Sequence, residues 1–181
     1  MIHRTNLRAQ LRLTMATTKP AATATAAKTD ATALLTRDHA EVKKLFKQYQ
    51  KLAAAEAHAS DRQALAEEIC MKLTVHATAE EEIFYPAARE ADVESDLLDE
   101  AEVEHASAKN LIAQIRAMSP DEDLYDAKVT VLGEYIDHHV QEEEQEMFPK
   151  CRKAKMDLAD LAARIAKRKS ELMAEASEEV V

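Results

Sequence analysis

Residues 139–149 read HVQEEEQEMFP, and residues 76–86 read HATAEEEIFYP. Each stretch has a histidine, a glutamate four positions later and a proline ten positions after the histidine. Residues four apart lie on the same face of a helix, so each stretch can direct an imidazole and a carboxylate at one point. Nitrogen and oxygen donors in this combination suit a divalent first-row transition metal. The sequence therefore predicts a metal site that includes His76, Glu80, His139 and Glu143.

A second pair of similar stretches adds two histidines. Residues 38–46 read DHAEVKKLF and residues 104–112 read EHASAKNLI, with an acid, a histidine, an alanine and a lysine at matching positions. The chain thus looks like a helical hairpin written twice, at a spacing of about 65 residues. His39 and His105 join the candidate metal ligands, and Glu144 is a reserve candidate. His138 is turned about 100° from His139 around the helix, so we expect it at the surface or behind the ligands.

The composition favours an all-helical protein. The 181 residues include one glycine, no tryptophan and 4% aromatic residues, whereas the strong helix formers Ala, Glu, Lys and Leu are abundant. The net charge of -10 argues against nucleic acid as a partner, because phosphate binding needs a basic surface. No apolar run approaches the roughly 20 residues of a membrane span. Cys70 and Cys151 are far apart in the sequence and fit no metal-binding spacing, so we expect reduced thiols in a cytoplasmic protein.

Apolar residues at helical spacing indicate five helices. The expected ranges are 31–56, from after Ser60 to about Pro86, 95–118, 121–148 and 157–176. Pro86 and Pro149 are expected to end or bend their helices, because proline has no backbone N–H. Ser119 followed by Pro120, with Glu122 three residues after Ser119, is a helix-start signal of the capping-box type. In the helix that follows, Leu124, Val131, Leu132 and Tyr135 are expected to face inward. Four long helices with short loops predict an all-α, antiparallel up-down-up-down four-helix bundle with an extra C-terminal helix.

The sequence divides into three segments. Residues 1–30 are basic and rich in Ala and Thr, and we expect a disordered tail. Their composition also superficially resembles an organelle transit peptide, and Met15 is an alternative start. Residues 31–155 are expected to form the bundle, and residues 156–181 the C-terminal helix and a frayed end.

The six candidate ligands favour two metal ions over one. Burying four imidazoles and two carboxylates without partners would cost several kcal/mol, which bound metal would offset. If Glu80 and Glu143 bridge two metals, each metal keeps two histidines, and an oxo, hydroxo or water ligand could complete the pair. Iron or manganese suits such a mixed donor set in a helical bundle, and a zinc pair is chemically possible.

The sequence resembles the hemerythrin-like, or HHE cation-binding, family over about residues 31–155. The resemblance rests on four motifs in order: Asp38-His39, His76 to Pro86, Glu104-His105 and His139 to Pro149. It implies an antiparallel four-helix bundle around a non-heme diiron centre. Its implied terminal ligands are His39, His76, His105 and His139, and its implied bridging carboxylates are Glu80 and Glu143. The implied cofactor is two iron ions with oxo or hydroxo and carboxylate bridges.

The sequence differs from the oxygen-carrying hemerythrins, which have a fifth histidine on the third helix. Here the residues one turn either side of His105 are Ala101 and Lys109. Four histidines and two glutamates are more similar to the iron-cluster repair proteins of the family, whose Cys-bearing N-terminal domain has no counterpart in this sequence. The leading hypothesis is a diiron protein that binds or senses O2, NO or peroxide, or handles iron. The alternatives are an enzyme that removes peroxide or repairs iron clusters, and a metal-free helical interaction module.

Overall fold

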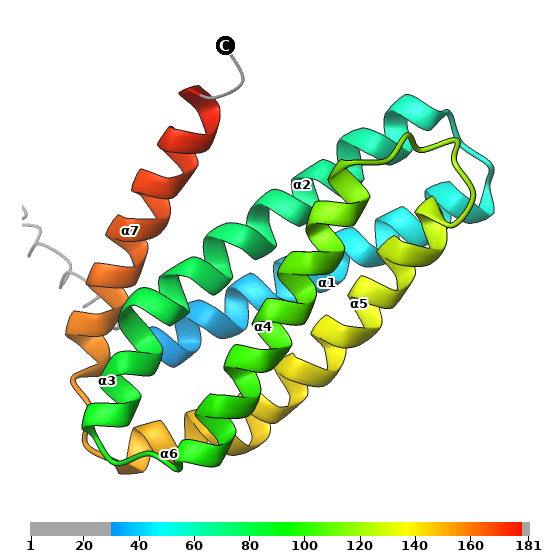
Figure 1. The fold of residues 1–181 in the computed structure, drawn as a ribbon. Coiled ribbons are helices and arrows are strands. Elements are labelled where there is room, and N and C mark those ends of the chain that lie inside the picture. The colour runs from blue at the N-terminus through cyan, green and yellow to red at the C-terminus, as the bar shows by residue number, and fades with distance from the viewer. Residues whose placement is uncertain (1–29, 179–181) are drawn as a thin grey trace, which may run out of the picture.

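The computed structural model describes residues 30–178, and these form a bundle of four antiparallel helical arms (Figure 1). The arms consist of α1 (Ala31–Ala54), then α2 (Ala59–Ala79) with η1 (Glu80–Phe84) and α3 (Tyr85–Glu90), then α4 (Ser95–Arg116), then α5 (Tyr125–Glu142) with η2 (Glu143–Met147) and α6 (Phe148–Lys153). A further helix, α7 (Leu158–Glu178), lies outside the four and packs on α1 and α2 (Figure 1). The prediction of an all-α four-helix bundle with an extra C-terminal helix is confirmed.

The second and fourth arms continue through their prolines, so neither proline ends its arm, which was one of the two predicted outcomes. Each arm contains one π-helical turn, η1 or η2, immediately before the proline. In these turns the N–H of Tyr85 donates to the carbonyl of Glu80, and the N–H of Phe148 donates to that of Glu143. Pro86 and Pro149 then occupy the first turn of the next α-helical segment, where a missing N–H costs little.

Two predicted helix starts were wrong. α5 begins at Tyr125 rather than near Asp121, because residues after Ser119 form a turn that ends with Leu124 in a left-handed conformation at φ 72°. The backbone N–H of Ser119 donates to the Glu122 side chain, so only part of the expected capping box forms. α2 begins at Ala59, and its N-cap residue, His58, makes no side-chain capping bond.

The core consists of two apolar clusters at opposite ends of the bundle. One cluster includes Leu35, Phe84 and Phe148 and is completed by Ile165 of α7. The other gathers residues near the α1–α2 and α4–α5 connections, among them Tyr49, Ile69, Ile112 and Leu132. A polar layer lies between the clusters, because the buried histidines and glutamates fall between these two sets of positions in every arm.

The inner face of the fourth arm agrees only in part with the sequence expectation, since Leu132, His139, Glu143 and Met147 are buried as expected. Tyr135, expected to face inward, is 52% exposed, and Leu124 and Val131 are also exposed. The only glycine of the sequence, Gly133, faces the first arm instead: a Cβ atom there would lie 3.1 Å from Cδ1 of Phe46. Close packing of α5 on α1 therefore explains why a residue without a side chain occupies this position.

Residues 1–29 and 179–181 lie outside the described residues, so the predicted tail and frayed end are untested there. Asp30 is described and caps α1, because its carboxylate accepts a 2.8 Å hydrogen bond from the N–H of Ala33. Within residues 30–178, every helix is too short or too polar to cross a lipid bilayer.

Candidate metal centre

The fold brings all six candidate ligands together in the polar layer. Each of α1, α2, α4 and α5 supplies one histidine, and the first residue of each π-helical turn supplies a glutamate. The Nε2 atoms of His39 and His76 lie 3.1 Å apart, as do those of His105 and His139. All six side chains are buried; they are His39, His76, Glu80, His105, His139 and Glu143.

Each carboxylate lies between histidines from the two different pairs. Glu80 Oε2 is 3.1 Å from His76 Nε2 and 3.5 Å from His105 Nε2. Glu143 Oε2 is 3.3 Å from the Nε2 of His39 and 3.5 Å from that of His139. A carboxylate in this place can contact two cations at once, so the arrangement is compatible with two metal positions that share both glutamates.

Every histidine of the centre also contacts a carboxylate through its other ring nitrogen. The Nδ1 atoms meet partners on a different helix at 2.8–3.3 Å: His39 with Glu144, His76 with Asp38, His105 with Glu81 and His139 with Glu104. Such partners fix the orientation of a metal-binding imidazole and strengthen it as a donor. Sequence reasoning assigned no such role to these acids. Their signal was their recurrence, since an acid precedes His39 and His105 and a glutamate follows five positions after His76 and His139.

The hydrogen bonds determine which ring atoms face the centre. An ionised carboxylate only accepts hydrogen bonds, so each Nδ1 carries the proton that it donates. In a neutral imidazole, Nε2 then presents a lone pair. Four such lone pairs face one another together with carboxylate oxygens. Glu80 Oε1, Glu80 Oε2 and Glu143 Oε2 are buried and have no hydrogen-bond partner among residues 30–178. So many hydrogen-bond acceptors with so few hydrogen-bond donors require added positive charge. Imidazole nitrogens and carboxylate oxygens are ligands that suit divalent metal ions.

The pKa shifts also indicate that positive charge stabilises the centre. Burial disfavours a charged His76, but the carboxylates of Glu80 and Asp38 outweigh it and raise the pKa of His76 to about 10. Burial and the nearby His139 lower the pKa of His105 to about 3. The charges of His139 and His39 outweigh burial at Glu143 and lower its pKa. The cluster therefore takes up protons unevenly when no metal ion competes with them.

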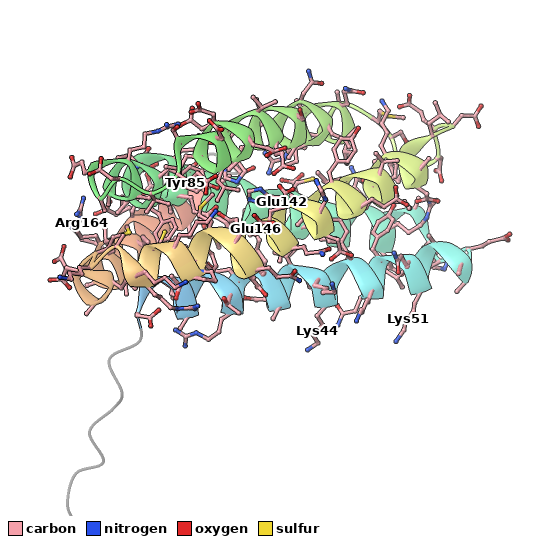
Figure 2. All side chains as sticks on the ribbon, turned by 90° about the horizontal axis from the view of Figure 1, so that it is seen from below. Lys44, Lys51, Tyr85, Glu142, Glu146 and Arg164 are labelled. Carbon is pink, nitrogen blue, oxygen red and sulfur yellow. The ribbon has the colours of Figure 1, made fainter. Side chains whose placement is uncertain are left out.

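Two aromatic residues distinguish the two halves of the centre. The π-helical turns make consecutive residues of each arm face inward, and these include Tyr85 in one repeat and Phe148 in the other. The ring of Phe148 stacks on that of His39 at 5.9 Å. The hydroxyl of Tyr85, a residue labelled in Figure 2, donates to Glu143 Oε1 at 3.0 Å and lies 3.4 Å from His105 Nε2. Tyr85 is thus a polar residue of the centre to which sequence reasoning gave no role.

Three basic residues within one helical turn of a candidate histidine, His138, Lys43 and Lys109, lie outside the centre. His138 is exposed and lies near Glu104 and Glu142 rather than the buried histidines. Lys43 pairs with the exposed Asp137. Lys109 donates to Glu81 at 2.7 Å and so contacts the carboxylate partner of His105.

A cavity adjoins the centre on the side away from Tyr85. The four histidines lie at its margin, and its remaining wall is mostly aliphatic: Val42, Leu73, Ala77, Ala108, Ile112, Ile136 and Val140, with Asp38 and Lys109. Few polar groups other than the histidines reach this space, so it favours a small molecule of low polarity.

Comparison with known proteins agrees with this architecture. Residues 30–151 match a family model described as the hemerythrin HHE cation binding domain. A protein of Nostoc sp. named DNA nickase is 34% identical over 118 residues, which cover 64% of this chain but only 31% of that protein. A solved structure of a hemerythrin HHE cation binding domain-containing protein from Mycobacterium kansasii is similar in fold, with a TM-score of 0.69 and 24% identity over 83% of this chain and 91% of that one. The chain belongs to the hemerythrin HHE cation-binding domain family.

Proposed function

We propose that the protein is a non-heme diiron protein that binds or senses a small molecule, O2, NO or peroxide, at the buried centre. His39 and His76 would hold one iron ion, His105 and His139 the other, and Glu80 and Glu143 would bridge them. The observation that carries the proposal is the inward-facing set of four imidazole Nε2 atoms beside buried carboxylate oxygens that have no hydrogen-bond partner in the described part of the chain. Bound iron would supply one-electron redox chemistry and an open coordination position.

The protein's own residues would define what reaches the centre. The aliphatic wall of the cavity, including Val42, Ile112 and Ile136, would exclude water and favour a neutral diatomic molecule over a charged substrate. The acids at Nδ1 would hold the four imidazole rings in place. Cys70 and Cys151 are both free and buried, which fits a reducing compartment such as the cytoplasm.

An enzyme that removes peroxide or repairs iron clusters is the second candidate. One observation favours it: the hydroxyl of Tyr85 places a proton donor inside the centre, beside Glu143 and His105. The DNA-nicking activity named for the Nostoc relative is not part of the proposal, because the match covers 31% of that protein and the net charge of -10 disfavours phosphate binding.

Metal content and the optical spectrum of protein purified without a metal-binding tag test the proposal. We expect about two iron ions per chain, as in other dinuclear carboxylate centres of helical bundles, with a spectral change on adding O2, NO or peroxide after reduction. A spectral change that is complete at a stoichiometric amount of the added molecule indicates binding, and repeated turnover of peroxide indicates an enzyme. Zinc or manganese as the tightly held metal, or no metal after reconstitution with ferrous iron, would refute the diiron proposal.

A further inference from the structure

We propose that α7 supplies a positioning residue, Lys169, which sets the donor strength of His76 through Asp38. The inference rests on the proposed diiron function. It concerns a helix that begins after residue 151, where the match to the family model ends. Lys169 reaches the centre through a carboxylate and does not contact the candidate ligands itself.

A continuous chain of contacts connects α7 with the centre. The ammonium group of Lys169 forms an ion pair with Asp38 Oδ2, and the same oxygen lies 3.3 Å from His76 Nδ1. The Lys169 side chain is 23% exposed and that of Asp38 is 16% exposed, so solvent screens this pair less than a surface pair. His76 Nε2 in turn faces His39 and Glu80 inside the centre.

Two further contacts fix α7 in this position. Ile165, one turn before Lys169, is completely buried in an apolar cluster of the bundle. Arg168 donates from Nε to Glu82 at 2.6 Å, and Glu82 belongs to the same π-helical turn as Glu80. The helix α7 is therefore held against α1, α2 and η1, the segments that carry His39, His76 and Glu80. These contacts restrict where Lys169 can lie.

Lysines pair with the carboxylate partners of two of the four histidines. His105 has a comparable chain, since its partner Glu81 pairs with Lys109 of the bundle itself. Among residues 30–178, no lysine or arginine side-chain nitrogen lies within 4 Å of a carboxylate oxygen of Glu104 or Glu144, the partners of His139 and His39. Each histidine pair thus includes one member whose carboxylate is neutralised by a lysine. For the pair of His39 and His76, that lysine comes from α7.

The charge of the lysine determines the direction of its effect. A carboxylate at Nδ1 strengthens an imidazole as a donor, and a cation on the carboxylate moderates that effect. Removing the charge of Lys169 would make Asp38 a stronger partner of His76 and favour ferric over ferrous iron. We expect Lys169→Met to lower the reduction potential by about 59 mV for one electron. This corresponds to an about tenfold increase in the affinity for ferric iron relative to the affinity for ferrous iron.

Removing the carboxylate provides a test with the opposite sign. Asp38→Asn should raise the potential, because His76 then loses its anionic partner. Lys169→Arg should keep it near the wild-type value. Lys167→Met is the matched control on α7, since Lys167 is 80% exposed and, among residues 30–178, pairs with Glu171 alone, at 3.6 Å.

Spectroelectrochemical titration of the full-length iron-loaded proteins, with iron content measured for each, provides the readout. Opposite shifts for Lys169→Met and Asp38→Asn, with no shift for Lys169→Arg or Lys167→Met, support the inference. Equal shifts for Lys169→Met and Lys169→Arg, or an unchanged potential in both Lys169→Met and Asp38→Asn at wild-type iron content, overturn it and leave the diiron proposal intact. A wild-type protein that takes up no iron overturns both.

Discussion

Replacing Tyr85 with phenylalanine tests the electrostatics of the centre by removing a single oxygen atom. Tyr85 is 1% exposed, and its ring packs in the apolar cluster that includes Phe84 and Phe148. Burial and the charges of Glu143 and Glu80 raise the pKa of Tyr85 well above its ordinary value. The phenol therefore stays protonated at neutral pH and donates to Glu143.

The expected loss follows from the hydrogen bond that disappears. A hydrogen bond to a charged group contributes about 1.5–3 kcal/mol, and the phenylalanine ring keeps the apolar packing. Without the hydroxyl, Glu143 Oε1 loses its donor, whereas Glu143 Oε2 already has no hydrogen-bond partner within residues 30–178. We expect the free energy of unfolding of metal-stripped Tyr85→Phe to fall by about 1.5–3 kcal/mol at pH 7. The loss should be smaller in the iron-loaded protein, where metal ions would balance the carboxylate charge.

Urea unfolding followed by far-ultraviolet circular dichroism measures both forms. Tyr49→Phe is the matched control, because the Tyr49 hydroxyl donates to Asp126 at 2.5 Å and Tyr49 belongs to the opposite apolar cluster. Its loss of stability should be the same with and without iron. A Tyr85→Phe protein as stable as wild type without metal, or equally destabilised in both forms, would refute the reasoning.

Three further predictions concern pH, ligand identity and packing. Because the pKa of His76 is raised from 6.5 to about 10, its contribution to the stability of the metal-stripped protein is complete below pH 6.5 and is lost as the pH rises through 10; urea titrations should show this fall for metal-stripped protein and not for iron-loaded protein. His139→Ala should abolish stoichiometric iron binding, whereas His138→Ala, at a side chain that is 63% exposed, should leave the iron content unchanged by elemental analysis. Gly133→Val should lower the free energy of unfolding by about 1–3 kcal/mol, because the added side chain meets the ring of Phe46; thermal unfolding at wild-type stability would contradict this.

Much of the fold was predictable because its signals are local. Apolar residues at helical spacing indicated the helices, and the repeated His-x3-Glu pattern identified side chains that one helical turn brings together. The helix ends were less predictable. The π-helical turns that carry the arms through Pro86 and Pro149 are rare within α-helices, and helical periodicity does not predict them. The start of α5 at Tyr125 depends on the turn after Ser119, where the local capping signal formed only in part.

The exposed residues of α5 illustrate a second limit. Periodicity alone assigned Tyr135 and Val131 to the inner face, yet both are exposed. An error of this kind arises because periodicity does not set how wide the buried face of a helix is. Contact with the neighbouring helices sets its edges: Leu132 and His139 are buried as expected, and Gly133 lies against Phe46.

The sequence by itself determined the helical class, the two repeats and the six candidate ligands, because each follows from residues within one or two turns of the same helix. Only the tertiary structure decided which acid meets which histidine, since Glu144 reaches His39 and Glu104 reaches His139 from other helices. It also placed the hydroxyl of Tyr85 inside the centre and Lys169 on Asp38. Such contacts join residues far apart in the chain. They depend on the rotation and axial position of the packed helices, and no local sequence pattern encodes these.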